Sequence, residues 1–205
     1  MIAPTGKANR ISWISKMHNH RMTICNFGQR ISIVGTTGSG KTMVARQISS
    51  RLKLPYIELD ALYWDENWTG VSDQVFRERV VLATKTEQWV IDGNYSRIRS
   101  LIWERANTVV YLDYSFWKTF WQLFRRTIQR SIQREALWHG NREDLRRSFF
   151  SSDSIMLWMF KTYARRRKQY TMLMQQPEYV HLCFVQLKTP RMTRAWLSNL
   201  TITAN

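Results

Sequence analysis

Eight consecutive residues constrain the fold of this chain more than any other segment. They match the phosphate-binding pattern G-x-x-x-x-G-K-[ST] at every fixed position and read Gly35-Thr36-Thr37-Gly38-Ser39-Gly40-Lys41-Thr42. Its glycines permit positive φ and close approach, so that successive backbone N–H groups can point inward and surround a phosphate. We call residues 35–42 the phosphate loop and predict that all eight contact a nucleotide.

The neighbouring sequence supplies the context that such a loop requires. Residues 30–34 are typical of a short buried strand, and Val44, Ile48 and Leu52 recur at helical spacing. In a strand–loop–helix unit, Lys41 reaches the β- and γ-phosphates, and the hydroxyl of Thr42 can ligate Mg²⁺. The predicted cofactors are therefore ATP and Mg²⁺, although the pattern does not distinguish ATP from GTP.

Strand-like and helical segments alternate along the rest of the chain. We predict further strands at 56–60, 89–92, 108–112 and 179–184, and helices after Ser72, at 116–134, at 153–175 and around 195–197. This order indicates an α/β fold with a mainly parallel, doubly wound sheet covered on both faces. Residues 28–205 are expected to form one domain. Residues 1–27 contain no acid and are expected outside the core. They are either a poorly ordered appendage or the result of a translation start that is assigned too early in the sequence.

Charge and cysteine content narrow the possible partners. The chain has a net charge of +16, and residues 116–170 hold thirteen Lys/Arg against four acids, which implies an anionic partner. Both a phosphate-handling enzyme and a nucleic-acid binder fit this pattern.

The two cysteines are far apart and suggest reduced thiols in a cytoplasmic protein. No apolar run is long enough to span a bilayer, so we expect no membrane partner; the oligomeric state is not predicted.

Carboxylates that end apolar strands are the candidate metal and substrate ligands. Asp92, followed by Gly93, is the predicted Mg²⁺ residue, with a turn-forming role as the alternative. Asp60 is predicted to bind the hydroxyl of the acceptor or to act as a base. Asp113 is expected to be structural.

Aromatic and basic side chains give weaker signals. Trp64 and Trp68 can stack on a planar substrate, but large aromatics more often serve packing. Arg126, Arg130 and Arg134 recur at spacings of four, so they share one helical face that can meet phosphate oxygens. Phosphoryl transfer needs only one or two such cations, and the remainder are expected on the solvated surface.

Several landmarks together resemble small kinases related to adenylate kinase, within a bacterial group labelled "adenylate kinase and related kinases" or "DNA topology modulation protein". They are the phosphate loop and the segments 57–64, 89–95, 111–113, 140–143 and 189–191. The resemblance implies a three-layer fold with a five-stranded parallel sheet of order 2-3-1-4-5. It also implies a substrate-binding insertion near 60–85 and an arginine-bearing helical lid near 125–167.

The same resemblance implies roles for individual residues. The catalytic lid arginines would be Arg126, Arg130, Arg142 and one of Arg165–Arg167, here taken as Arg166. Arg97 lies near the position that holds an acceptor phosphate, offset by one residue. Thr189-Pro190 falls in the adenine-side loop. The Trp-rich segment does not look like an AMP site.

Two functions follow as expectations. The first is ATP- and Mg²⁺-dependent phosphoryl transfer to an unidentified small-molecule acceptor, with Asp60, Trp64 and Arg97 contacting that acceptor. The alternative is a nucleic-acid-associated NTPase that uses its basic helices to bind DNA or RNA.

Overall fold

A five-stranded parallel sheet forms the centre of the computed structural model, which describes residues 11–13, 25–133, 138–140 and 155–200. The strands lie in the order β4-β5-β3-β6-β7, and each neighbouring pair is parallel. In chain order within this sheet the arrangement is 2-3-1-4-5, which confirms the prediction. The strand bounds are β3 (Arg30–Gly35), β4 (Tyr56–Glu58), β5 (Trp89–Asp92), β6 (Thr108–Leu112) and β7 (Cys183–Leu187).

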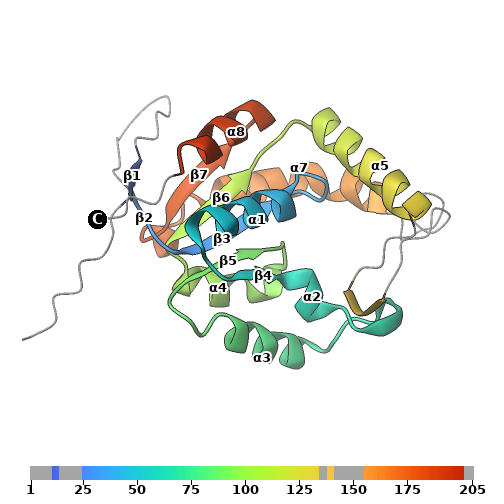
Figure 1. Cartoon of the computed structure of the whole chain (residues 1–205), viewed down its shortest axis with the longest axis horizontal. Helices are drawn as coiled ribbons and strands as arrows, with labels where there is room; N and C mark the ends of the chain where they lie inside the picture. The colour runs from blue at the N-terminus through green and yellow to red at the C-terminus, as the bar shows by residue number, and fades with distance from the viewer. Residues whose placement is uncertain (1–10, 14–24, 134–137, 141–154, 201–205) are drawn as a thin grey trace, which may run out of the picture.

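Helices connect these strands (Figure 1). Their bounds are α1 (Lys41–Leu52), α2 (Leu59–Tyr63), α3 (Asp73–Ala83), α4 (Arg99–Arg105), α5 (Phe116–Gln133), α7 (Ile155–Leu173) and α8 (Pro190–Ser198). Short 3₁₀ turns are η1 (Glu66–Trp68), η2 (Ser96–Ile98), η3 (Trp138–Gly140) and η4 (Pro177–Tyr179). A separate antiparallel pair consists of β1 (Ile11–Trp13) and β2 (Cys25–Phe27).

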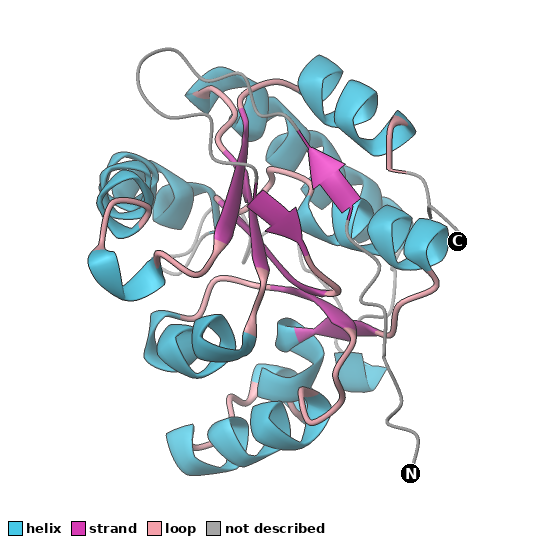
Figure 2. Cartoon of the chain, turned by 90° about the vertical axis from the view of Figure 1, so that its left-hand side faces the viewer, coloured by secondary structure: helices cyan, strands magenta, loops and turns pink. Residues whose placement is uncertain are grey.

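The sheet is buried on both faces, and alternate strand residues enter two different cores (Figure 2). Ile31 and Ile33 of β3 pack in the core under α1 and α8, whereas Val34 packs in the core that contains α3, α4 and α7. This arrangement explains why the strands are nearly continuous apolar runs in the sequence. The observed layers are helices, sheet and helices.

Local sequence signals set several helix ends. The hydroxyl of Ser72 accepts a hydrogen bond from Val75 N at 3.3 Å and caps α3 as predicted. Thr189 caps α8 in the same way, through Met192 N at 3.1 Å, and Pro190 occupies the first turn.

Two predicted strand boundaries are wrong. The strand expected at 56–60 ends at Glu58, and Asp60 lies in α2, because the buried side chain of Leu59 turns back over Gly93. The strand expected at 179–184 is β7 at 183–187. Pro177 begins a 3₁₀ turn there, and the ring of Tyr179 packs 4.9 Å from Trp103 instead of continuing a strand.

The prediction of reduced thiols is also wrong, because Cys183 at the start of β7 is disulfide-bonded. The sequence has one other cysteine, Cys25 in β2.

Within the described ranges, none of the helices combines the length and the apolar character needed to cross a bilayer. Residues 134–137 and 141–154, which include much of the expected lid with Arg134 and Arg142, lie outside the described residues, as do most of residues 1–24.

Candidate functional site

The candidate site lies at the carboxyl ends of three neighbouring parallel strands. β3 runs into the phosphate loop, and the sheet register pairs Ile33 of β3 with Asp92 of β5 and Asp92 with Glu58 of β4. Ligands of open α/β sheets bind at this edge, in the crevice beyond the strands. The sheet topology therefore places the loop and the strand-end carboxylates together.

The phosphate loop has the backbone that its glycines predicted. Gly38 and Gly40 have φ values of 79° and 88°, in the left-handed region that favours glycine. Gly38 also lies against α5: a Cβ there would lie 2.7 Å from Leu123 Cβ and 2.8 Å from the carbonyl oxygen of Thr119. A side chain at position 38 would thus displace the helix that carries Arg126.

The two predicted metal ligands are in direct contact. The hydroxyl of Thr42 donates a hydrogen bond to Asp92 Oδ2 at 2.7 Å, and the hydroxyl of Tyr56 donates to Asp92 Oδ1 at 3.1 Å. Burial raises the pKa of Asp92 from 3.8 to about 6, and the Thr42 hydrogen bond and the charge of Lys41 oppose that rise. Two hard oxygen ligands thus lie beside the phosphate loop, as a magnesium ion requires.

Lys41 lies at the centre of the charged groups. Its Nζ donates to the carbonyl oxygen of Thr36 at 3.2 Å. Burial lowers its pKa to about 8, while Asp92 and Asp60 raise the pKa and Arg166 and Arg126 lower it. The structure therefore brings five predicted site residues into one electrostatic cluster: Lys41, Asp60, Asp92, Arg126 and Arg166.

Two side chains that sequence reasoning did not assign to the site hold this cluster together. The amide of Asn94 donates to the carbonyl oxygen of Gly35 at 2.6 Å and accepts from the hydroxyl of Tyr170 at 2.5 Å. It therefore joins the phosphate loop to α7. The hydroxyl of Tyr95 donates to Asp60 Oδ1 at 2.5 Å. Both residues follow the strand-end Asp92-Gly93, and this position was the available sequence signal.

Other predicted site residues have contacts beside this cluster. The guanidinium of Arg97 pairs with Asp73 and lies 4.6 and 5.8 Å from the ring centres of Tyr63 and Tyr95. Trp64 packs edge-on against Tyr63, at a ring distance of 4.7 Å, and against Trp68, at 5.7 Å.

The other residues singled out in the sequence lie in helices α5 and α8 and after strand β6. Thr189 and Pro190 form the start of α8, and Arg130 lies one turn beyond Arg126 in α5. Asp113, which is expected to be structural, pairs with Arg167 Nε at 2.9 Å and accepts from Gln186 Nε2 at 2.8 Å.

A strongly basic pocket of about 640 Å³ adjoins the cluster. It lies between the segment after β5 and helix α7. Four cations line it, and among the described residues it has no acidic lining side chain; the cations are Arg99, Arg165, Arg166 and Lys168. Asn94 lines it too, and Arg166 acts electrostatically on Lys41, so the pocket shares Arg166 with the phosphate-loop cluster. Sequence reasoning named Arg97 on this segment, whereas Arg99 is the residue that faces the pocket.

Comparisons with known proteins identify the fold. The family described as "ATPase family associated with various cellular activities (AAA)" matches residues 31–92. A shikimate kinase from Acinetobacter baumannii in complex with shikimate has a TM-score of 0.50 and 16% identity, over 83% of this chain and 89% of that chain. A gluconokinase from Sinorhizobium meliloti 1021 has a TM-score of 0.49 and 19% identity, over 85% of this chain and 94% of that chain. No curated protein matches in sequence. The chain thus has the fold shared by P-loop NTPases and P-loop kinases.

Proposed function

We propose that the chain catalyses ATP- and Mg²⁺-dependent phosphoryl transfer to a small-molecule acceptor, as a P-loop kinase of the adenylate-kinase-related group. The observation that carries this proposal is the convergence of Lys41, the Thr42–Asp92 pair, Arg126 and Arg166 at the phosphate loop. Catalysis of phosphoryl transfer depends on positioning and on charge stabilisation, and these residue types provide both.

The residues around the loop fit a nucleotide and its metal. Ser39 Oγ is buried and has no hydrogen-bond partner among the described residues, so it is available to a phosphate oxygen. The amino group of Lys41 is cationic near neutral pH, because its pKa of about 8 lies above that pH. Mg²⁺ held by Thr42 and Asp92 would neutralise phosphate charge.

The side chains divide the chemistry between them. Lys41 and the loop amides would hold the β- and γ-phosphates, while Arg126 and Arg166 would balance the charge on the transferred group. Asp60 would orient the acceptor hydroxyl and take its proton as the new P–O bond forms and the bond to the β-phosphate oxygen breaks. Tyr95 fixes the Asp60 carboxylate for that role.

The basic pocket indicates which acceptors to test. Four cations without a lining acid favour a ligand that carries negative charge, such as a phosphate or carboxylate group, in addition to the hydroxyl. We therefore propose an anionic acceptor that lies between Asn94 and helix α7, with its reactive hydroxyl toward Asp60.

ATP turnover against pools of nucleosides, nucleotides, sugars and carboxylic acids, with separate DNA and RNA samples at two salt concentrations, tests the reaction class. We expect an anionic pool to raise turnover and mass spectrometry to find its phosphorylated member. Stimulation by nucleic acid alone, lost at high salt, would instead favour the NTPase reading.

Lys41→Ala should lower turnover by about a thousandfold or more, because a buried cation beside the phosphates is lost. Lys85→Ala is the matched control, since Lys85 is exposed and lies before β5, at the opposite edge of the sheet. Unchanged turnover in Lys41→Ala would refute the assignment of the loop.

Arg99→Gln and Arg97→Gln separate the two candidate acceptor arginines. We expect Arg99→Gln to raise the KM for the anionic acceptor about tenfold or more while the KM for ATP stays constant. Arg97→Gln should change the acceptor KM little, because Arg97 is paired with Asp73. The reverse result would move the acceptor to the Arg97 side.

A further inference from the structure

Helix α5 carries an apolar surface that no other part of the described chain covers. Its residues share one side of the helix, at spacings of four and seven: Trp117, Trp121, Ile128 and Ile132. We call these four residues the α5 stripe; the ring of Phe124 between them packs on the cluster of Leu123 and Met159. The side chains of Trp117, Trp121 and Ile132 are 67%, 61% and 71% exposed. Apolar groups of this size seldom remain in water in such a row.

The stripe is distinct from the two sides of α5 that have a partner. Phe116 and Phe120 pack on Phe160 of α7, at ring distances of 5.0 and 5.6 Å, and Leu123 lies against Gly38 of the phosphate loop. Arg126 lies within electrostatic range of Lys41. The stripe is the remaining side of α5, a helix that lies at the edge of the molecule (Figure 1).

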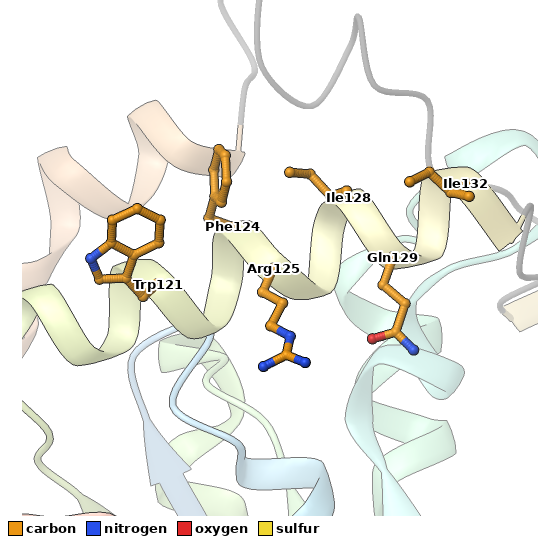
Figure 3. A pocket seen from close by; sticks show the side chains of 6 residues that line it. All are labelled: Trp121, Phe124, Arg125, Ile128, Gln129 and Ile132. Atoms are coloured by element: carbon orange, nitrogen blue, oxygen red, sulfur yellow. The ribbon is translucent and has the colours of Figure 1, made fainter.

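Cations border the stripe. Lys118 and Arg125 are exposed on the adjoining side of the helix, and the sequence of α5 contains no acid. Figure 3 shows Phe124, Ile128 and Ile132 along α5 with Arg125 and Gln129 beside them. These residues and Trp121 line an open, mainly apolar depression of about 570 Å³.

We propose that the α5 stripe is a docking surface for an anionic membrane, on which α5 lies in the plane of the lipid headgroups. Helices that bind membrane surfaces combine one apolar side that contains Trp, Phe or aliphatic residues with Lys or Arg on the polar side. Trp side chains favour the boundary between headgroups and acyl chains. Lys118 and Arg125 then meet acidic headgroups.

Charge and residue type argue against other occupants. A second copy docked through the same stripe would bring Lys118 and Arg125 close to the same cations of its partner, without an acid on α5 to offset them. Of the stripe side chains, only Trp117 and Trp121 could stack on the bases of a nucleic acid, whereas Ile128 and Ile132 are aliphatic. The expectation of no membrane partner concerned a spanning segment, and surface binding requires only one apolar side.

Cosedimentation of the full chain with vesicles tests this proposal. One set is phosphatidylcholine alone, and the other contains about one third phosphatidylglycerol, which supplies the anionic surface. We expect binding to the anionic vesicles, with an affinity that falls as salt is added. A chain that binds neither set, or both equally, overturns the proposal.

Two double variants locate the surface. Trp117→Gln with Trp121→Gln, and separately Lys118→Glu with Arg125→Glu, should each raise the lipid concentration at half-binding about tenfold or more. Leu82→Gln with Val180→Gln is the control, because those side chains are 73% and 86% exposed on other elements. Circular dichroism of each variant checks that it is folded.

The results that assign the stripe to something else are also specific. A dimer in sedimentation equilibrium that the Trp substitutions abolish, without vesicle binding, would show that a second copy occupies the stripe. DNA binding that depends on the two Trp residues, without vesicle binding, would show a nucleic-acid surface. Either result overturns the membrane proposal.

Discussion

Gly38→Ala tests whether helix α5 rests on the phosphate loop. Gly38 has a φ of 79°, and an added Cβ would lie 2.7 Å from Leu123 Cβ and 2.8 Å from the carbonyl oxygen of Thr119. The left-handed backbone costs about 1–2 kcal/mol for a residue with a side chain. The forced separation of packed atoms adds about 1–3 kcal/mol, because Thr119 contributes backbone and cannot move independently. We expect a total destabilisation of about 2–5 kcal/mol.

Gly40→Ala is the matched control in the same loop. Its φ of 88° is similar, but the nearest atom to an added Cβ is Met43 Cε at 3.9 Å, an ordinary contact with a flexible side chain. Gly40→Ala should therefore show only the backbone contribution of about 1–2 kcal/mol. The difference between the two variants isolates the contact with α5.

Urea unfolding of the nucleotide-free protein, followed by far-ultraviolet circular dichroism, measures both values. Gly38→Ala should unfold at a clearly lower urea concentration than Gly40→Ala. If the two variants are equally destabilised, α5 does not pack on the loop. Arg126 would then not lie beside Lys41 either.

Two further predictions concern the strand-end carboxylates. Burial raises the pKa of Asp92 from 3.8 to about 6, so the native state favours the protonated form. Relative to Asp92→Asn, the stability of the wild-type protein should therefore fall by up to about 3 kcal/mol as the pH rises through that window. Thermal unfolding of both proteins from pH 4 to 7 measures this difference. A constant difference between the two proteins across that range would contradict the burial argument. Asp113→Ala should lower the free energy of unfolding by about 1–3 kcal/mol, because the partly buried amide of Gln186 loses its acceptor, while ATP turnover stays within about twofold. A large loss of turnover without loss of stability would give Asp113 a part in catalysis.

Features that depend on neighbouring residues in the chain could be predicted from the sequence. The phosphate loop, its strand and its helix follow from a motif whose glycines are needed locally for positive φ, and the structure shows all three. The position of Asp92 at a strand end could be predicted because an apolar run precedes it. The order of the sheet came from a family resemblance, and the structure confirms it.

Predictions failed where distant contacts compete with local preference. The strand at 56–60 ends early because Leu59 packs over Gly93, which lies in a different part of the sequence. Arg97 and Arg99 both lie after β5; the structure pairs Arg97 with Asp73 and places Arg99 at the basic pocket, a difference that spacing along the chain does not specify. The bridge made by Asn94 between the loop and Tyr170 likewise depends on how α7 packs.

The sequence by itself determined the phosphate loop, the alternation of strands and helices, and the excess of cations, because each depends only on adjacent residues or on composition. Only the tertiary structure decided which charges meet. Lys41, Asp60, Asp92, Arg126 and Arg166 come from separate elements, and parallel strands bring them to one edge of the sheet. The physical reason is that electrostatic interactions and packing depend on distance in space, which the spacing of residues along the chain does not specify.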